Sequence, residues 1–183
     1  MTTPLKAVAA GGNSAELREW VAGDFLPVSL GGTGGTTAAA ARSNLGLGSA
    51  AVAAIVGTVS QSGGVPTGAI IQRGSNANGE FVRFADGTQI CWKTQTVNTA
   101  ISNSDGGSVL YSPAVDLGTY PAAFSGTAPS TTLSVSGGGA GAFLTSSSIS
   151  QTLTSWGSYY LTSGASRTAA NYYISCVAIG RWF

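Results

Sequence analysis

The feature that most constrains this chain is its scarcity of charge. Only 8% of the 183 residues are Asp, Glu, Lys or Arg, whereas an ordinary soluble domain carries about 25%. No charged residue occurs between positions 117 and 166. Gly, Ala, Ser and Thr make up more than half of the chain, so few bulky apolar residues remain to build a large core. A surface this poor in charge is expected to be buried against further copies of the chain, and we predict an obligate oligomer.

The missing residue types exclude several functional classes. The sequence has no His, which excludes Ser-His-Asp and Cys-His catalysis and the common histidine-based metal sites. Neither Lys6 nor Lys93 lies in a phosphate-binding loop motif, and a net charge of +1 predicts no nucleic-acid partner. No apolar run approaches the roughly 20 residues of a membrane-spanning helix, so we expect no membrane insertion. We also expect no cofactor and no metal site.

Carboxylates are the only acids and bases left for catalysis. A glycosidase needs two of them on opposite sides of the scissile bond. Asp86 is expected in a turn, and Asp105 lies in an Asn-Ser-Asp-Gly-Gly run that is typical of a turn. The same run could hold a calcium ion through its oxygens, although the turn is the favoured interpretation. We therefore predict that the protein is not an enzyme, with a capsule depolymerase as the alternative.

The two cysteines are too few for a disulfide scaffold in a chain of this length. Cys91 and Cys176 both lie in stretches that alternate like strands, and we expect them to be reduced and buried.

From residue 66 onward the pattern predicts strands. Residues 80–84 alternate, Asp86-Gly87 is a strong hairpin signal, and residues 88–97 form the returning strand. Further strands are expected at residues 68–73, 108–111, 131–136, 143–145, 158–162 and 172–179. Strands at this spacing without helices between them predict an all-β sandwich or barrel. We interpret residues 66–183 as an all-β head with a β-sandwich fold.

The first 65 residues have a different character. A short helix is expected near residues 13–24, where Trp20 lies on its apolar face. A second is expected near residues 37–45, capped by Thr36 or Thr37 and closed by Gly46. We divide this part into an N-terminal segment, residues 1–30, and a thin Gly/Ala-rich shaft, residues 31–65, that includes a flexible joint at residues 60–64.

Two stretches resemble the tail fibres of bacteriophages and of phage-derived tail particles. Residues 26–51, LPVSLGGTGGTTAAAARSNLGLGSAA, are similar to the tail-fibre repeat, of which one copy is present. Residues 68–92, GAIIQRGSNANGEFVRFADGTQICW, and residues 178–182, AIGRW, resemble the start and the end of a tail-fibre head domain. The resemblance covers roughly a third of the chain.

The resemblance implies a homotrimer within the virion, assembled in the cytoplasm of the bacterial host. Its N-terminal end would attach to a tail or baseplate protein, and its distal head would bind a host-surface glycan. A gene transfer agent or a tailocin fits the same motifs as a phage does. A structural connector without a receptor site stays open as an alternative.

Aromatic residues amid small polar ones are the best candidates for receptor contact, because rigid rings stack on sugars while hydroxyls and amides bind their hydroxyl groups. They lie in the segment that departs furthest from the recognisable motifs. One member of each adjacent tyrosine pair is expected to point inward. The candidate receptor-binding residues are Trp156, Tyr159, Tyr160, Arg167, Asn171 and Tyr172.

Overall fold

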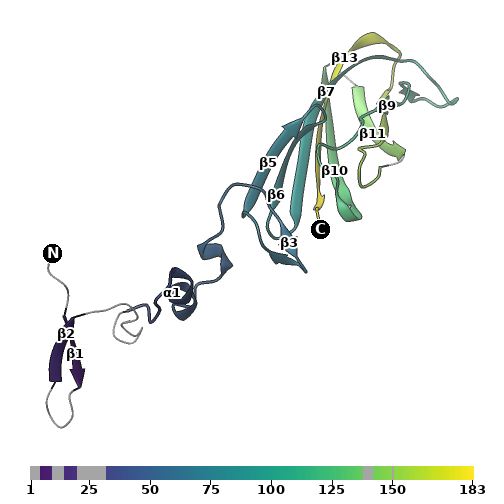
Figure 1. The fold of residues 1–183 in the computed structure, drawn as a ribbon. Helices are drawn as coiled ribbons and strands as arrows, with labels where there is room; N and C mark the ends of the chain where they lie inside the picture. The colour runs from purple at the N-terminus through teal and green to yellow at the C-terminus, as the bar shows by residue number, and fades with distance from the viewer. Residues whose placement is uncertain (1–4, 10–14, 20–31, 138–141, 150) are drawn as a thin grey trace. The chain divides into compact units, whose positions relative to one another are not determined.

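The computed structural model describes residues 5–9, 15–19, 32–137, 142–149 and 151–183 (Figure 1). Its contacts divide the chain into two compact units, Met1–Val52 and Ala53–Phe183. The second unit consists of antiparallel strands in sheets. The all-β head predicted from the sequence is therefore confirmed.

The N-terminal unit begins with a hairpin where the sequence predicted a helix. Strand β1, Leu5–Ala9, pairs antiparallel with β2, Ala15–Glu19. A helix of about ten residues is marginal on its own, whereas the paired strands satisfy each other's backbone groups. The helix predicted near residues 13–24 is wrong over β2, and Trp20 lies outside the described residues.

The second predicted helix is confirmed with both of its ends. Helix α1, Ala38–Asn44, is capped by Thr37, whose Oγ1 accepts a hydrogen bond of 3.1 Å from the Ala40 backbone N–H. Gly46 follows the last turn at φ 68°, the left-handed conformation that favours glycine. A short 3-10 helix, η2, covers Ser49–Ala51. No helix in the described part of the chain is long and apolar enough to cross a membrane.

A five-stranded sheet forms one layer of the head, in the order β10-β13-β7-β6-β5. Its strands are β5 Ile71–Asn76, β6 Gly79–Phe84, β7 Thr88–Ile101, β10 Ser125–Gly137 and β13 Arg167–Arg181. The predicted turn joins β6 to β7, where Gly87 adopts φ 94° and Asp86 Oδ1 accepts a 2.8 Å hydrogen bond from the Thr88 N–H.

A smaller sheet forms the second layer. Its order is β11-β12-β8, and β9 also pairs with β12. The strands are β8 Leu110–Tyr111, β9 Val115–Asp116, β11 Ala142–Ile149 and β12 Ser158–Ser163. Because the buried cluster draws residues from β7 and β13 on one side and β12 on the other, the core lies between the two sheets.

Residues 53–65 join the head through backbone hydrogen bonds. The Ile71 N–H donates to Ile55 O at 2.9 Å, and the Gly57 N–H donates to Ile71 O at 2.9 Å. Where the sequence analysis expected a flexible joint, β3, Gln61–Ser62, and β4, Val65–Pro66, form a small antiparallel hairpin. Two consecutive glycines with positive φ make its tight turn. The boundaries at residues 30 and 65 stay predictions.

Candidate receptor-binding site

Half of the predicted receptor-binding residues lie in the core. Trp156, Tyr159 and Tyr172 are 0%, 2% and 0% exposed, so the expectation that they contact a receptor is wrong for this head. The Trp156 ring packs against Tyr120 with 4.5 Å between centroids, and Lys93 Nζ lies 5.9 Å from its centre. In a chain so poor in bulky apolar residues, these large rings supply the volume that fills the core.

The polar atoms of these three rings are buried as well. Trp156 Nε1, Tyr159 Oη and Tyr172 Oη have no hydrogen-bond partner among the described residues. Their burial therefore follows from the apolar area of the rings and not from a polar network.

The other predicted residues reach solvent but do not form one surface. Asn171 lies on the outer face of β13, where its Oδ1 accepts a 2.8 Å hydrogen bond from Asn98 Nδ2. Arg167 Nε donates to Ser163 Oγ at 3.1 Å. Tyr160 is half-buried on β12, in the other sheet. The structure thus separates the predicted set into a core group and three residues at different places.

Tyr160 borders a surface depression that the sequence analysis did not foresee. Tyr159 and Leu161 point into the core, so Tyr160 and Thr162 point to the opposite face of β12. Tyr111 of β8 pairs directly with Thr162. Its ring therefore meets that of Tyr160 edge to face, with 5.6 Å between centroids and an angle of 82°.

Two residues of the preceding loop complete this tyrosine depression, which has a volume of about 360 Å³ and is lined by Asp105, Val109, Tyr111, Tyr160 and Thr162. Asp105 is its only charged residue, and one carboxylate oxygen accepts a 3.1 Å hydrogen bond from the Gly107 N–H. This bond confirms the predicted turn. Only the pairing of β8 with β12 brings the two tyrosines together, and a local sequence pattern carries no signal for that pairing.

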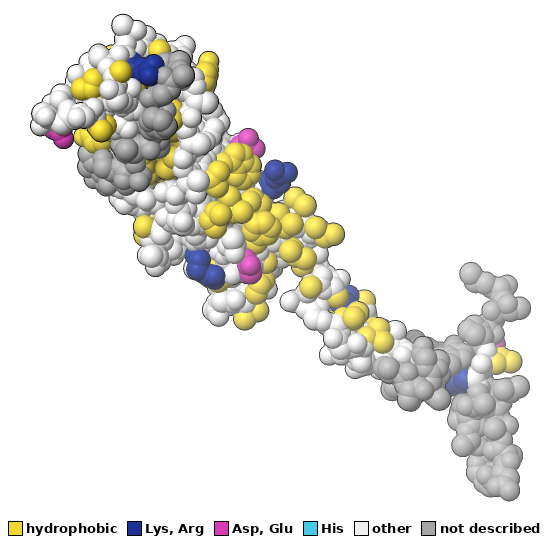
Figure 2. Space-filling view, turned by 180° about the vertical axis from the view of Figure 1, so that it is seen from behind, with side chains coloured by type: hydrophobic (Ala, Val, Ile, Leu, Met, Phe, Trp, Pro, Cys, Tyr) yellow, Lys and Arg dark blue, Asp and Glu magenta, His cyan; other side chains and the backbone are white. Residues whose placement is uncertain are grey.

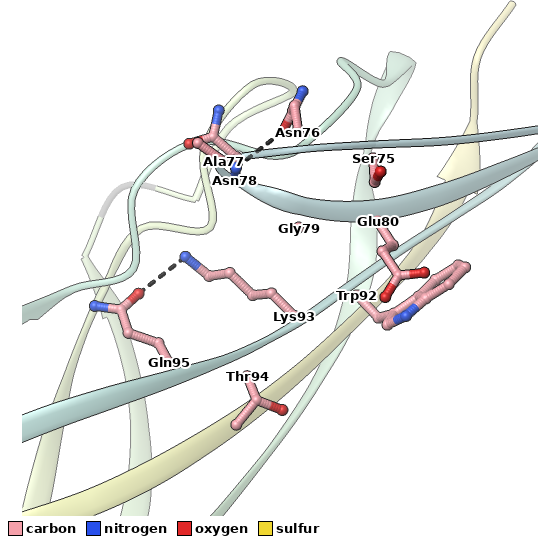
Figure 3. A pocket seen from close by; sticks show the side chains of 10 residues that line it. All are labelled: Ser75, Asn76, Ala77, Asn78, Gly79, Glu80, Trp92, Lys93, Thr94 and Gln95. Carbon is pink, nitrogen blue, oxygen red and sulfur yellow. Dashed lines mark hydrogen bonds between the residues drawn. The ribbon is translucent and has the colours of Figure 1, made fainter.

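A larger groove of about 650 Å³ lies between the β5–β6 turn and β7 (Figure 3). Figure 3 shows the Glu80 carboxylate beside the Trp92 indole at one end of this groove. At the other end Lys93 Nζ donates to Gln95 Oε1 at 2.9 Å and also to the backbone carbonyl of Leu117. Much of the groove's polar lining is therefore already occupied by the chain itself.

The outer face of the five-stranded sheet is apolar at its centre. Cross-strand register places Val82, Ile90 and Ile179 in one row, and Trp92 with Val177 in the next. Ile179 is 50% and Val177 39% exposed. Figure 2 shows hydrophobic side chains gathered over the side of the head that faces the viewer. We call these five residues the outer apolar patch.

Two opposite charges lie beside this patch. Arg73 pairs with Val82 in the sheet, and Glu80 pairs with Trp92, so both belong to the same outer face. Each is exposed, and neither makes an ion pair with a described residue. The face therefore combines unburied apolar area with a cation and an anion.

The inner face of the same sheet holds both cysteines as free thiols, as predicted. Cys91 pairs with Ala178, and Cys176 pairs with Lys93, so the thiols lie on adjacent strands of the buried face. Burial raises the pKa of each thiol to about 11. Both are consequently protonated and unreactive near neutral pH.

Comparison with solved structures finds fibres of pyocins. The chain is similar to the R1 pyocin fibre of P. aeruginosa, residues 323–701, at 22% identity and a TM-score of 0.44, with 86% of this chain and 35% of that chain covered. It is also similar to an N-truncated R1-type pyocin tail fibre at 22% identity and a TM-score of 0.44, with 80% and 98% covered.

A third similarity is to the R2 pyocin fibre of P. aeruginosa, at 18% identity and a TM-score of 0.34, with 95% of this chain and 38% of that chain covered. The chain thus spans about a third of the length of the two longer fragments. No protein-family model matches the chain, and no curated protein matches it significantly.

Proposed function

We propose that the chain is a tail fibre adhesin of a phage or phage-like particle. Three copies assemble side by side, the N-terminal part attaches to a tail or baseplate protein, and the head binds a glycan on the host surface. The tail-fibre motifs at residues 26–51, 68–92 and 178–182 support this proposal. The same motifs support a location in the virion after assembly in the bacterial cytoplasm.

The observation that carries the assembly is the outer apolar patch. The chain buries the inner face of its five-stranded sheet against β12 but leaves Val177 and Ile179 substantially exposed on the other face. Contiguous apolar area of this kind marks an interaction surface. Packing against further copies removes it from water and accounts for a chain with so few charges.

Charge on the same face favours a second copy of this chain as the occupant. Arg73 and Glu80 lie beside the patch on the strands β5 and β6. A repeated copy offers each of them a partner of opposite sign, because every copy carries both charges. Three such contacts close a ring around one axis.

We propose that the head acts by adhesion and not by catalysis. The three heads of one fibre, and several fibres on one particle, bind with an effective concentration that turns weak single-site contacts into strong attachment. Such multivalent binding needs no reaction at the bound sugar.

The test uses the purified full chain and a panel of bacterial surface polysaccharides. We expect adsorption to at least one polysaccharide without release of reducing ends. A variant that fails to assemble, Ile179→Asp, is expected to lose most of the adsorption because avidity falls with the number of heads. Release of reducing ends would indicate a depolymerase. Absence of adsorption to every surface polysaccharide would favour a structural connector.

A further inference from the structure

We infer that the tyrosine depression of Asp105, Tyr111, Tyr160 and Thr162 is the sugar site of the head, and that it selects neutral or amine-bearing sugars over acidic ones. The inference rests on the proposed adhesin function and gives it a site and a ligand class. The predicted residues Trp156, Tyr159 and Tyr172 are buried, whereas this depression lies at the surface.

The arrangement of the rings suits a pyranose. Tyr111 and Tyr160 meet at 82°, so the edge of one ring covers the other and they do not stack face against face. In such a T-shaped pair the ring that offers its edge keeps its two faces free of its partner. A flat, rigid ring at the surface offers contact area to sugar C–H groups at little entropic cost. A volume of about 360 Å³ lies within the range of about 300–1,000 Å³ that is common for small-molecule sites.

Two phenol groups and one carboxylate oxygen of the depression make no hydrogen bond to a described residue. The phenol groups of Tyr111 and Tyr160 make no hydrogen bond to a described residue. Asp105 uses one carboxylate oxygen for the Gly107 N–H, which leaves its second oxygen for a ligand. A carboxylate that accepts bonds from sugar hydroxyls makes the stronger, charge-assisted kind of hydrogen bond.

The larger groove of Figure 3 is the weaker candidate. Its Lys93 and Gln95 already bind the backbone of residues 116–117, and its Asn76 Nδ2 donates to Pro121 O at 2.9 Å. Two more of its lining residues, Glu80 and Trp92, lie on the outer face that we assign to assembly. The tyrosine depression belongs to the other sheet, so assembly through the outer face leaves it accessible.

The charge of the depression determines the ligand class. Among the described residues that line it, Asp105 alone is charged. A carboxylate attracts a protonated amine and repels the carboxylate of an acidic sugar. Arg167, the one cation among the predicted receptor-binding residues, does not line this depression. We therefore assign glucosamine-like and neutral sugars to the site and not uronic acids.

The experiment uses the full chain and three matched probes, methyl glucoside, glucosamine and glucuronic acid, together with their galactose-series counterparts. Binding is measured by ligand-observed NMR at pH 7. We expect the amine-bearing sugar to bind at least as tightly as the neutral one of the same series, and the acidic sugar to bind at least about tenfold more weakly.

Asp105→Asn keeps the shape of the side chain and is expected to abolish this charge preference. Tyr160→Ala is expected to abolish binding, and Tyr160→Phe to keep the stacking contribution.

The outcomes distinguish a failure of the proposed sugar site from a failure of the proposed adhesin function. If the chain adsorbs to a bacterial polysaccharide but Asp105→Asn and Tyr160→Ala leave sugar binding unchanged, the site lies elsewhere and the adhesin stands. Preferred binding of glucuronic acid by the wild type would overturn the ligand class, and binding of none of the probes would overturn the inference as a whole. If the wild type also adsorbs to no polysaccharide, the proposed function fails with it. Circular dichroism of each variant establishes that it is folded.

Discussion

The two faces of β13 differ although they belong to the same strand. Ile174, Cys176 and Ala178 alternate inward and are at most 1% exposed. Val177 and Ile179, between and beside them, point outward and are 39% and 50% exposed. Farther back along the same face Asn171 and Ser175 are polar, as expected of a strand side that meets solvent, so the exposed apolar pair stands out at the C-terminal end of the strand. The contrast shows that one chain leaves apolar area of this sheet in water, which supports the proposed packing against neighbouring copies.

The most damaging change to the core that the inner face covers is Trp156→Ala. The ring is fully buried against Tyr120, so its removal leaves a large cavity and is expected to cost about 3–5 kcal/mol of unfolding free energy. Thermal unfolding followed by circular dichroism measures the loss. The matched control is Tyr160→Ala, where a half-buried ring should cost about 1 kcal/mol or less. Equal melting temperatures for both variants would mean that Trp156 is not part of the core.

The outer face is tested by Ile179→Asp. A charge in the outer apolar patch would be buried without a partner on assembly, which we expect to raise the dissociation constant on the order of 100-fold. The melting of the separated chain should change little, because the side chain is 50% exposed. Sedimentation velocity over a concentration series measures the dissociation constant of each variant and of the wild type. Val109→Asp, at a residue 54% exposed beside the other sheet, should assemble like the wild type. If it dissociates as readily, the outer face has no special role.

The smallest expected effect is a dependence of the unfolding free energy on pH. Burial raises the pKa of Cys91 and Cys176 from 9.0 to about 11, so the native state keeps protons that the unfolded chain releases. Stability is therefore constant below about pH 8 and falls as the pH rises from about 9 to 11. Melting temperatures across this range measure the fall.

Cys176→Ala is the control for the pH effect. It removes one of the two thiols, whereas Lys93, whose pKa is lowered by burial, is present in both proteins and contributes in the opposite direction. The variant should lose less stability above pH 9 than the wild type does. An identical decline in both proteins would show that the Cys176 thiol does not contribute to it.

The features that the sequence predicted well are local ones, namely helix ends and turns. Thr37 and Gly46 mark the two ends of α1, and Asp86-Gly87 marks the β6–β7 turn, because caps and turns depend on neighbouring residues. The strand β2 was missed because its partner β1 competes with the helical pattern, and pairing between separate segments leaves no local signal.

The candidate site was less predictable for the same reason. Alternation correctly predicted that one member of each adjacent tyrosine pair points inward, but it did not say which, and the predicted set included the buried Tyr172 in place of the exposed Tyr173. It could not tell that Trp156, outside any strand, covers the core. It also could not place Tyr111 beside Tyr160, because that contact depends on the register of two strands that lie about 50 positions apart.

The mass of the intact chain in solution tests the central claim most directly. The account predicts an assembly of three copies through the outer apolar patch, with three times the 18.1 kDa mass of one chain. Light scattering coupled to size-exclusion chromatography at micromolar concentration measures this mass without any variant. A single species at three times the chain mass is the predicted result. A folded species at 18.1 kDa, stable with Val177 and Ile179 in water, would contradict the account.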